Sequence, residues 1–328
     1  MKPLLWLMAA ALPLGAQPKL LVNAKLDTRS AAAGLEQAFR PLVTAQPQPA
    51  WIAYSVPSTR VNLGCDYVRD GWNQPGVIHL EPPDHAVIFF RVDAGAVERI
   101  RTLSPDCEID AGDLPVHWLA DVKPAESVAL LDAFATQRER HMDGALSAIA
   151  SHSDPAAEAA LQRFLGPSQP ESIRLRVVHW FDTSMRGRRG FDVLKNLIAT
   201  DPSDRVRERA ISTLGNSKEP EALDLLIATA RKDPDSRLRM HAISALDRHS
   251  GAKVLDTFKE AIESDPDMQV KRRAVHALQS MPDGEGIPLL IQLARATHDN
   301  EVRKQAMNSL GQSHDGRAIS FFEEVLKK

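Results

Sequence analysis

The chain has 328 residues, of which 43% are apolar and 25% charged, and its formal net charge is −3. This balance is typical of a folded globular protein and excludes a disordered chain, a collagen-like fibre and a polytopic membrane protein. Near-neutral charge and an aromatic content of 5% argue against nucleic acid as a partner, because neither a basic field nor a stacking surface is provided. At roughly 150 residues per domain, the length favours two domains.

The N-terminal segment, residues 1–16, has the pattern of a secretory signal peptide. Lys2 precedes an apolar run over residues 3–14, and the small residues Gly15 and Ala16 follow. This run is shorter than the roughly 20 apolar residues that a membrane-spanning helix requires. The sequence therefore predicts cleavage near Ala16, a secreted or periplasmic location, and no membrane insertion after cleavage. An N-terminal core helix is the alternative interpretation.

Two cysteines, Cys65 and Cys107, lie in the first half of the chain. In an oxidising compartment such a pair favours a disulfide, and closing a loop of about 43 residues would stabilise the fold by about 4 kcal/mol. The alternative is a pair of free thiols that form half of a metal site with a nearby histidine. Two cysteines supply only half the ligands of a structural zinc site, so we expect the disulfide.

Residues 17–122 are predicted to form a small β-rich domain with one helix. The helix is expected over residues 32–43, with Pro41 near its end. Short β-branched and aromatic runs between turn residues predict strands over residues 51–56, 77–80, 86–92, 97–103 and 116–119. Residues 93–96 favour a hairpin turn, and the partial alternation of the strand that follows indicates an edge or half-exposed position.

From Arg205 onward the sequence repeats with a period of 32 residues. Three apolar columns align, namely Val206, Leu238, Val270 and Val302; Ala210, Ala242, Ala274 and Ala306; and Leu214, Leu246, Leu278 and Leu310. Successive columns are four residues apart, so each trio lies on one face of a helix. Turn residues and a second apolar stripe follow, which predicts one helix–turn–helix pair per repeat. With two weaker upstream copies, residues 123–328 are expected to form a helical array.

The borders of the repeats carry helix-capping residues. Asp235, Asp267 and Asp299 precede the first helix of their repeats, and Ser203 holds the matching place. Their side-chain oxygens are expected to accept an unpaired backbone N–H at the start of each helix. The last predicted helix has Ile319 and Leu326 on one side and polar residues on the other, which predicts a terminal cap with a polar outer face.

The motif Val-Arg-x-x-Ala-x-x-x-Leu after an Asp-rich turn resembles HEAT repeats, in particular the short bacterial type similar to phycobilisome-lyase repeats, in an exported protein. The resemblance covers residues 139–328 and rests on Val206-Arg207, Leu238-Arg239, Val270-Lys271 and Val302-Arg303. It implies a right-handed stack of antiparallel helix pairs that binds proteins. It also implies a ladder in which Arg207, Arg239, Lys271 and Arg303 meet Asp233, Asp265 or their equivalents. Lys271 is expected to make a weaker link, because lysine lacks the planar fork of arginine.

The sequence thus predicts an α+β chain with a small β-rich N-terminal domain and an all-α C-terminal solenoid of HEAT-like helix pairs. The favoured function is an exported scaffold or adaptor, a monomer without cofactor or metal, that holds a protein partner of unknown identity on the concave face of the solenoid. The second helix of each pair is expected to line that face. Its exposed recurring residues are Lys195, Lys259, Glu260, Gln292, Glu323 and Glu324.

A hydrolase or metal-dependent enzyme in the N-terminal domain, with the repeats presenting substrate, is the second hypothesis. It requires two or more of His79, Asp84, His85 and Asp106 to meet in a cleft. The chain has no HExxH, G-x-S-x-G, P-loop or G-x-G-x-x-G pattern, so no catalytic residue is assigned.

Three further features of the sequence give weaker functional signals. The acidic loop at residues 106–110 has carboxylates at alternate positions that could bind calcium, but we interpret it as a solvated turn. The basic run at residues 186–190 falls at an expected turn between helices and is interpreted as exposed. A bilin lyase or its helper is a third function, which only the family resemblance implies.

Overall fold

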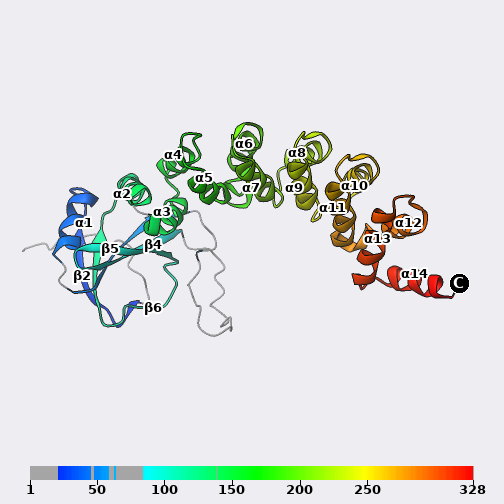
Figure 1. Ribbon diagram of the computed structural model, residues 1–328. Coiled ribbons are helices and arrows are strands. Elements are labelled where there is room, and N and C mark those ends of the chain that lie inside the picture. The colour runs from blue at the N-terminus through cyan, green and yellow to red at the C-terminus, as the bar shows by residue number, and fades with distance from the viewer. Residues whose placement is uncertain (1–20, 46–47, 59–62, 64–83, 138, 328) are drawn as a thin grey trace, which may run out of the picture. The chain divides into compact units, whose positions relative to one another are not determined.

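The structure of the protein is a computed structural model that describes residues 21–45, 48–58, 63, 84–137 and 139–327. The chain divides into two compact units, Met1–Arg163 and Phe164–Lys328. Figure 1 shows a sheet with helices in the first unit and helices alone in the second. The predicted α+β class, with a C-terminal helical array, is therefore confirmed.

A five-stranded sheet forms the centre of the first unit. Its strands in spatial order are β2 (Lys25–Ser30), β7 (Pro115–Ala120), β3 (Ala50–Pro57), β4 (His85–Asp93) and β5 (Ala96–Leu103). The first three are parallel, and β4 and β5 continue antiparallel. A separate two-stranded ladder pairs β1 (Leu21–Val22) with β6 (Ile109–Asp110).

Four of the five predicted strands are confirmed by β3, β4, β5 and β7, and the fifth, over residues 77–80, lies outside the described residues. The predicted hairpin joins β4 to β5 through Ala94 and Gly95, whose φ angles of 47° and 74° give the left-handed turn that matches strand twist. The following strand, β5, lies at the sheet edge as expected. Strand β2 was not predicted, because its sequence, Lys-Leu-Asp-Thr-Arg-Ser, has a single large apolar residue.

Helices cover one face of this sheet. They are α1 (Leu35–Thr44), α2 (Pro124–Gln137) and α3 (Glu139–Ser151), and α4 (Pro155–Phe164) follows α3. Phe39 of α1 and Phe134 of α2 both pack on Phe90 of β4. Their ring centroids lie 4.8 and 5.7 Å, respectively, from the Phe90 centroid. The backbone of α3 approaches β5 so closely that a Cβ atom at Gly144 would lie 2.6 Å from the Ile100 carbonyl oxygen. Helices α2 and α3 therefore belong to the sheet unit, although the sequence analysis begins the array at residue 123.

A second apolar cluster lies on the other side of the sheet. It includes Phe89, Trp118 and Cys107, of which Cys107 is only 2% exposed. The other cysteine, Cys65, lies outside the described residues, as does the predicted signal peptide. The expected disulfide and cleavage site therefore stay predictions.

Five successive helix pairs make up the described part of the second unit. The first helices are α5 (Glu171–Val177), α7 (Asp204–Leu214), α9 (Ser236–Leu246), α11 (Met268–Ser280) and α13 (Asn300–Gln312). The second helices are α6 (Thr183–Thr200), α8 (Pro220–Lys232), α10 (Ala252–Ser264), α12 (Ile287–Ala296) and α14 (Gly316–Leu326). Short 3-10 turns at Val178–Phe181 and Pro282–Gly284 adjoin the helices.

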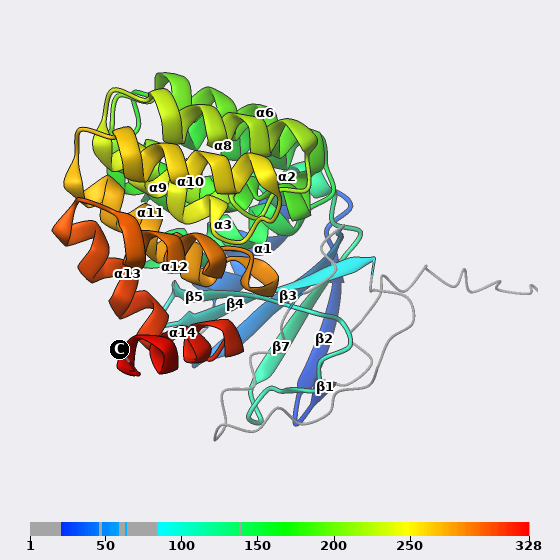
Figure 2. The same ribbon diagram turned by 90° about the vertical axis from the view of Figure 1, so that its right-hand side faces the viewer.

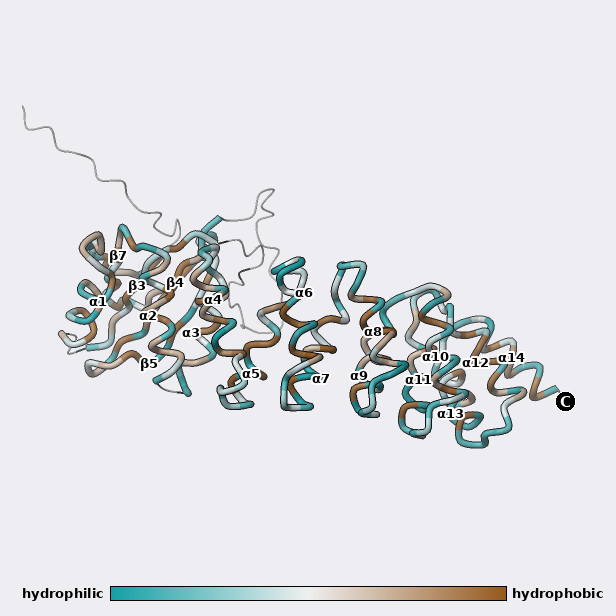
Figure 3. The backbone as a smooth tube through the Cα atoms, turned by 90° about the horizontal axis from the view of Figure 1, so that it is seen from above, coloured by the Kyte–Doolittle hydropathy of each residue, from teal (hydrophilic) through white to brown (hydrophobic). Residues whose placement is uncertain are grey.

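The predicted columns form the core of this array. All twelve column residues are at most 1% exposed. The predicted N-caps are confirmed, since the side chains of Ser203, Asp235, Asp267 and Asp299 each accept a backbone N–H of the following helix. Figure 3 shows apolar residues along the middle of the array and polar turns at its edges.

The helices of the second unit form two layers. Figure 2 shows α6, α8 and α10 in one layer and α9, α11 and α13 in the other. Figure 1 shows the first helices along the inner side of the bend and the second helices along the outer side. The small alanine column lies on the first helices, so these helices can stack more closely than the second helices. Residues of the second helices therefore lie on the outer side, not on the concave side where they were expected.

The last described helix lacks the predicted polar outer face. In α14 the residues that pack inward are Ala318 and Phe321, which are 1% and 4% exposed. Ile319 and Leu326 face solvent instead, with 54% and 85% exposure. The prediction of a polar cap is wrong, because the apolar stripe of α14 is wider than the surface that the preceding helices cover.

Candidate functional site

The six residues that the sequence analysis selected for binding all lie on exposed positions of second helices. Lys195 is on α6, Lys259 and Glu260 are on α10, Gln292 is on α12, and Glu323 and Glu324 are on α14. Two of them, Glu260 and Glu324, line grooves between consecutive second helices. We call these the α8/α10 groove and the α12/α14 groove.

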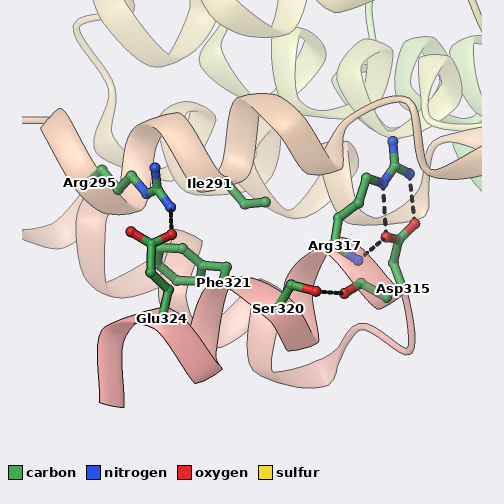
Figure 4. Close-up of a pocket in the computed structure, with 8 residues that line it drawn as sticks. Ile291, Arg295, Asp315, Arg317, Ser320, Phe321 and Glu324 are labelled. Atoms are coloured by element: carbon green, nitrogen blue, oxygen red, sulfur yellow. Dashed lines mark hydrogen bonds and ion pairs between the residues drawn. The ribbon is translucent and has the colours of Figure 1, made fainter. Parts of the chain in front are cut away.

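The α12/α14 groove is an open surface depression with a volume of about 600 Å³ (Figure 4). The guanidinium of Arg295 on α12 spans it and meets the carboxylate of Glu324 on α14 at 2.5 Å. The same guanidinium lies over the Phe321 ring, 5.5 Å from its centroid. Ile291 adds an apolar wall, so the groove offers charged and apolar contacts together.

The opposite end of this groove holds a second ion pair. Arg317 bonds to the Asp315 carboxylate at 2.6 Å and donates to the Gly284 carbonyl at 2.9 Å. Hydrogen bonds from Arg317 lower the pKa of Asp315 to about 2, so the carboxylate is ionised throughout the physiological range. Asp315 also caps α14 by accepting the Arg317 backbone N–H. The groove therefore presents fixed charges of both signs at each end.

The α8/α10 groove repeats the arginine–glutamate pair two repeats earlier. Its volume is about 190 Å³, and Arg231 of α8 meets Glu260 of α10 at 3.0 Å. Arg231 and Arg295 are 64 residues apart, as are Glu260 and Glu324, which is two periods of the repeat. In the intervening repeat these places hold Glu263 and Gln292, which cannot form an ion pair.

Both groove pairs are solvated. The side chains of Arg295 and Glu324 are 51% and 50% exposed, and those of Arg231 and Glu260 are 33% and 54% exposed. Exposed ion pairs contribute about 0 to 1 kcal/mol to folding, so the array does not depend on them. Their charges are consequently accessible to a partner.

A different set of ion pairs is buried within single repeats, where each pair joins the first helix to the turn after the second helix. Arg239 bonds to both carboxylate oxygens of Asp265, at 2.7 and 2.8 Å, with side chains 10% and 6% exposed. Arg174 bonds to Asp201 in the same way, at 3.0 Å for each bond. This second pair was not predicted, although Asp201-Pro202 holds the same place after α6 that Asp265-Pro266 holds after α10.

The other ladder residues make different contacts. Arg207 bonds to Asp204 of its own helix, and Arg303 donates to the Thr297 carbonyl. Lys271 donates to the Glu263 carbonyl at 3.3 Å. The place in the next repeat that corresponds to Asp265 is Thr297, so Lys271 has no carboxylate to meet there.

The residues of the enzyme hypothesis do not assemble a cleft in the described part of the chain. Asp84 and His85, which are neighbours in sequence, bond at 2.6 Å, but the Asp84 side chain is 90% exposed. The hydrogen bond from His85 lowers the pKa of Asp84. Asp106 lies 3.5 Å from the Ser104 hydroxyl, and His79 lies outside the described residues. Among the described residues, no three His, Cys, Asp or Glu side chains gather as a metal site.

A buried polar network in the first unit was not found from the sequence. The Ser127 hydroxyl lies 2.8 Å from the Tyr54 hydroxyl and 2.9 Å from His152 Nε2, and His152 Nδ1 lies 2.8 Å from the Ala148 carbonyl. Burial lowers the pKa of His152 and raises that of Tyr54. A serine–histidine contact is the geometry of an activated nucleophile, but these side chains are at most 2% exposed and no substrate can reach them. The network is structural.

The basic run at residues 186–190 lies inside α6, where Gly187 interrupts the helix with a φ of 53°. Arg188 bonds to Glu221 at 2.5 Å and to Asp192 at 3.2 Å, and Arg186 donates to the Trp180 carbonyl. Arg186 and Arg188 thus have hydrogen-bond and ion-pair partners within the second unit. None of the described helices combines the length and the apolar character that crossing a membrane requires.

A family model described as HEAT repeats matches residues 191–278 and 255–328. One solved structure with a similar chain is human deoxyhypusine hydroxylase in complex with glycerol, at 13% identity and a TM-score of 0.31, covering 61% of this chain and 90% of that chain. Another is the complex of CpcE and CpcF of phycocyanin lyase from Nostoc sp. PCC7120, at 16% identity and a TM-score of 0.33, covering 63% and 88%. A search of curated proteins finds no match. At these TM-scores the two structures carry no argument about activity.

Proposed function

Since residues 191–328 of this chain are HEAT repeats, we propose that the second unit is a protein-binding scaffold whose partner engages the α8/α10 and α12/α14 grooves. The observation that supports this proposal is the recurrence of one arginine–glutamate pair in both grooves. The pairs are exposed and contribute little to stability, so their charges can exchange the internal partner for a group on another protein. In the α12/α14 groove the pair adjoins Phe321 and Ile291, and protein interfaces favour this combination of arginine, aromatic and apolar side chains.

The partner that fits these grooves is a chain segment with charges of both signs around an apolar centre. In the α12/α14 groove, a carboxylate of the partner would meet Arg295 while an apolar side chain rests against Ile291 and Phe321. A cation of the partner would replace Arg295 at Glu324. Such a contact is selective because a segment with one sign of charge alone leaves one groove charge unpaired.

Charge reversal in the grooves tests the proposal. The variant carrying both Arg231→Glu and Arg295→Glu places like charges beside Glu260 and Glu324 without removing a buried contact. Co-purification from native envelope extract, read by mass spectrometry, should lose the partner that the unaltered chain recovers. Lys304→Glu is the matched control, because Lys304 is exposed on α13 and outside both grooves. Equal recovery with the double variant would contradict the groove assignment.

We further propose that the protein is exported and carries the disulfide between Cys65 and Cys107. The pattern of residues 1–16 and the burial of Cys107 support this proposal. Mass spectrometry of the chain purified from fractionated cells should give a start near Gln17, and alkylation before and after reduction should differ by two thiols. An intact N-terminus in the cytoplasmic fraction would contradict export. Two thiols that react without reduction would contradict the disulfide.

A further inference from the structure

The two helix layers of the second unit differ in charge. In the four helix pairs from α7 to α14, the first helices carry ten basic and three acidic residues. The basic residues are Arg205, Arg207, Arg209, Arg237, Arg239, Lys271, Arg272, Arg273, Arg303 and Lys304. The second helices of the same pairs carry six basic and seven acidic residues. The excess of positive charge therefore belongs to the first-helix layer.

The acidic residues of this layer already have basic neighbours. The pairs are Glu208 with His241 at 3.6 Å, Glu301 with Arg272 at 2.8 Å, and Asp204 with Arg207. In contrast, Arg209 is exposed, and no acidic side chain of the described residues pairs with it. Cations of this layer are thus accessible to a partner.

A column of basic residues crosses three of the first helices. Arg209 on α7, His241 on α9 and Arg273 on α11 hold the same place in successive repeats. Arg273 donates to the Ser244 hydroxyl of α9 at 2.5 Å, so its side chain lies over the junction between α9 and α11. The same place on α13 holds Gln305, so the column ends before α13.

A second group of cations lies around Asp247, at the end of α9. Burial raises the pKa of the Asp247 carboxyl, although Arg273, Arg248 and His276 act in the opposite direction. Among the described residues, no ion pair joins any of these three side chains to Asp247. Arg248 instead donates to the Asn216 side chain at 2.5 Å. The group therefore carries more positive charge than the single carboxylate can balance.

The spacing of the column fits an extended chain. Helix α7 packs on α9 and α9 packs on α11, and packed helices lie about 8 to 10 Å apart. Arg209 and Arg273 are two helices apart, which is roughly 16 to 20 Å. An extended segment rises about 3.3 Å per residue, so about six residues span this distance. Positions about six apart lie on the same side of a strand and of a polyproline II helix, because six is a multiple of both periods.

The chemistry of this layer favours a protein over a nucleic acid. Helices α7, α9, α11 and α13 contain no Phe, Tyr or Trp on which a base could stack. The net charge of the chain is −3, so no long-range field attracts a polyphosphate. The cations are also spread over three helices, whereas a single small anion requires cations that converge on one point.

The surface that these cations form, which we call the basic face, consists of Arg209, His241, Arg248, Arg273 and His276. We infer that the basic face binds an extended acidic segment of a protein partner, which crosses α7, α9 and α11. Two carboxylates of the segment, about six residues apart, meet Arg209 and Arg273. The basic face belongs to the inner side of the bend (Figure 1), whereas the two grooves lie between second helices on the outer side, so either proposal can fail without the other.

Fluorescence anisotropy of a labelled peptide tests the inference. The probe is a serine–proline peptide with glutamate at every third position, which should bind the full chain more tightly at about 0.01 M salt than at about 0.1 M. Arg209→Glu should weaken binding roughly tenfold, because it replaces an attractive charge by a repulsive one. Adding Arg273→Glu to this variant should weaken binding further.

The double variant of the grooves, Arg231→Glu with Arg295→Glu, is the matched control. It makes the same change of charge on the second-helix layer and should bind the peptide as the unaltered chain does. Absence of binding to the unaltered chain, or equal effects of the two double variants, would overturn the inference. Circular dichroism checks that each variant retains its helices. Arg209→Glu alone also tests the basic face, because Arg209 is exposed and its replacement removes no ion pair.

Three further probes test the charge, the spacing and the class of the ligand. A peptide with lysine in place of glutamate should not bind. A peptide of the same composition with its glutamates gathered at one end should bind less tightly, because it cannot meet both arginines. Equal binding of the gathered and the spaced peptide would overturn the crossing arrangement. Tighter binding of an oligothymidylate of similar charge than of the acidic peptide would overturn the assignment of a protein partner.

Discussion

The two units of this chain depend on contacts of different range. In the sheet unit, β2 pairs with β7, and Asp27 lies opposite His117, 90 residues away in sequence. In the helical unit, a repeat contacts the repeats beside it, about 32 residues away. The sheet unit therefore depends on contacts between segments far apart in the sequence, each of which occurs once. The helical unit depends on one kind of contact between neighbouring repeats, which occurs several times. A substitution in the contact between two repeats and a substitution in the sheet should therefore destabilise the chain in distinguishable ways.

The two units also differ in how they bury polar groups. The helical unit buries charges as two-bond arginine–aspartate pairs within single repeats, whereas the sheet unit buries a neutral network of Tyr54, Ser127 and His152. Removing one partner of a buried charge pair lowers the free energy of unfolding strongly. Protonation of a buried neutral histidine also lowers the free energy of unfolding, but only at acidic pH.

Removing the buried arginine should have the largest effect. Arg239→Ala leaves the Asp265 carboxylate buried without its cation, which should lower the free energy of unfolding by about 3 to 5 kcal/mol. Lys271→Ala is the matched control at the same place in the next repeat, and it should cost less than about 0.5 kcal/mol because Lys271 contacts only a carbonyl. Urea unfolding followed by far-ultraviolet circular dichroism measures both. If the two variants lower the free energy of unfolding equally, the Asp265 carboxylate does not account for the effect of Arg239→Ala.

A methyl group between α3 and β5 should have the next largest effect. In Gly144→Ala the new Cβ meets the Ile100 carbonyl oxygen, so α3 must move away from the sheet, at a cost of about 1 to 3 kcal/mol. Hydrogen exchange should increase in β4 and β5 while α9 to α13 keep their protection. If exchange becomes faster only in the helical array, α3 packs with the repeats and not with the sheet. That outcome would support the domain boundary near residue 123 that the sequence predicts.

Protonation should weaken the sheet unit at mildly acidic pH. Burial lowers the pKa of His152 below the ordinary value of about 6.5 that it takes in the unfolded chain. As the pH falls, the unfolded state therefore binds this proton before the folded state does. The contribution of His152 to the free energy of unfolding should be constant above about pH 6.5 and should fall below it, by at most about 1.4 kcal/mol per pH unit. His152→Gln should remove this part of the slope. Urea unfolding by tryptophan fluorescence at several pH values tests it, and an unchanged slope would contradict the prediction.

The groove pair should have the smallest effect on folding. Arg295→Ala, Glu324→Ala and the double variant should each change the free energy of unfolding by less than about 1 kcal/mol, with a coupling of at most about 0.5 kcal/mol. Thermal unfolding of the three variants measures the coupling. A coupling near that of a buried pair would show that the pair stabilises the array and is not available to a partner.

The helical unit was predictable in detail because its information is local and repeated. The alanine column and the residues that cap each first helix are each present several times, so one chance match cannot produce the pattern. The end of the array could not be predicted in the same way. Residues such as Leu326 satisfy the apolar period of a core helix, and only the position of the neighbouring helices shows that nothing described covers them.

The candidate site was predictable only in part. Exposure of Glu260 and Glu324 follows from their places outside the apolar stripe, and the structure adds that both lie in grooves beside an arginine. Their location on the outer side of the bend could not be predicted, because curvature depends on how closely each helix layer packs. The Ser127–His152 contact was also missed, since the two residues are 25 positions apart on different helices and carry no motif.

The period, the helix borders and the identity of the buried columns follow from the amino-acid sequence alone, because these depend on spacing along one helix and on residues adjacent to it. The packing of α2 and α3 on a sheet, the choice of arginines that meet a carboxylate, and the exposure of apolar residues on α14 become visible in three dimensions alone. Each of these outcomes depends on the distance between segments that the chain brings together in folding, and spacing along the sequence does not specify that distance.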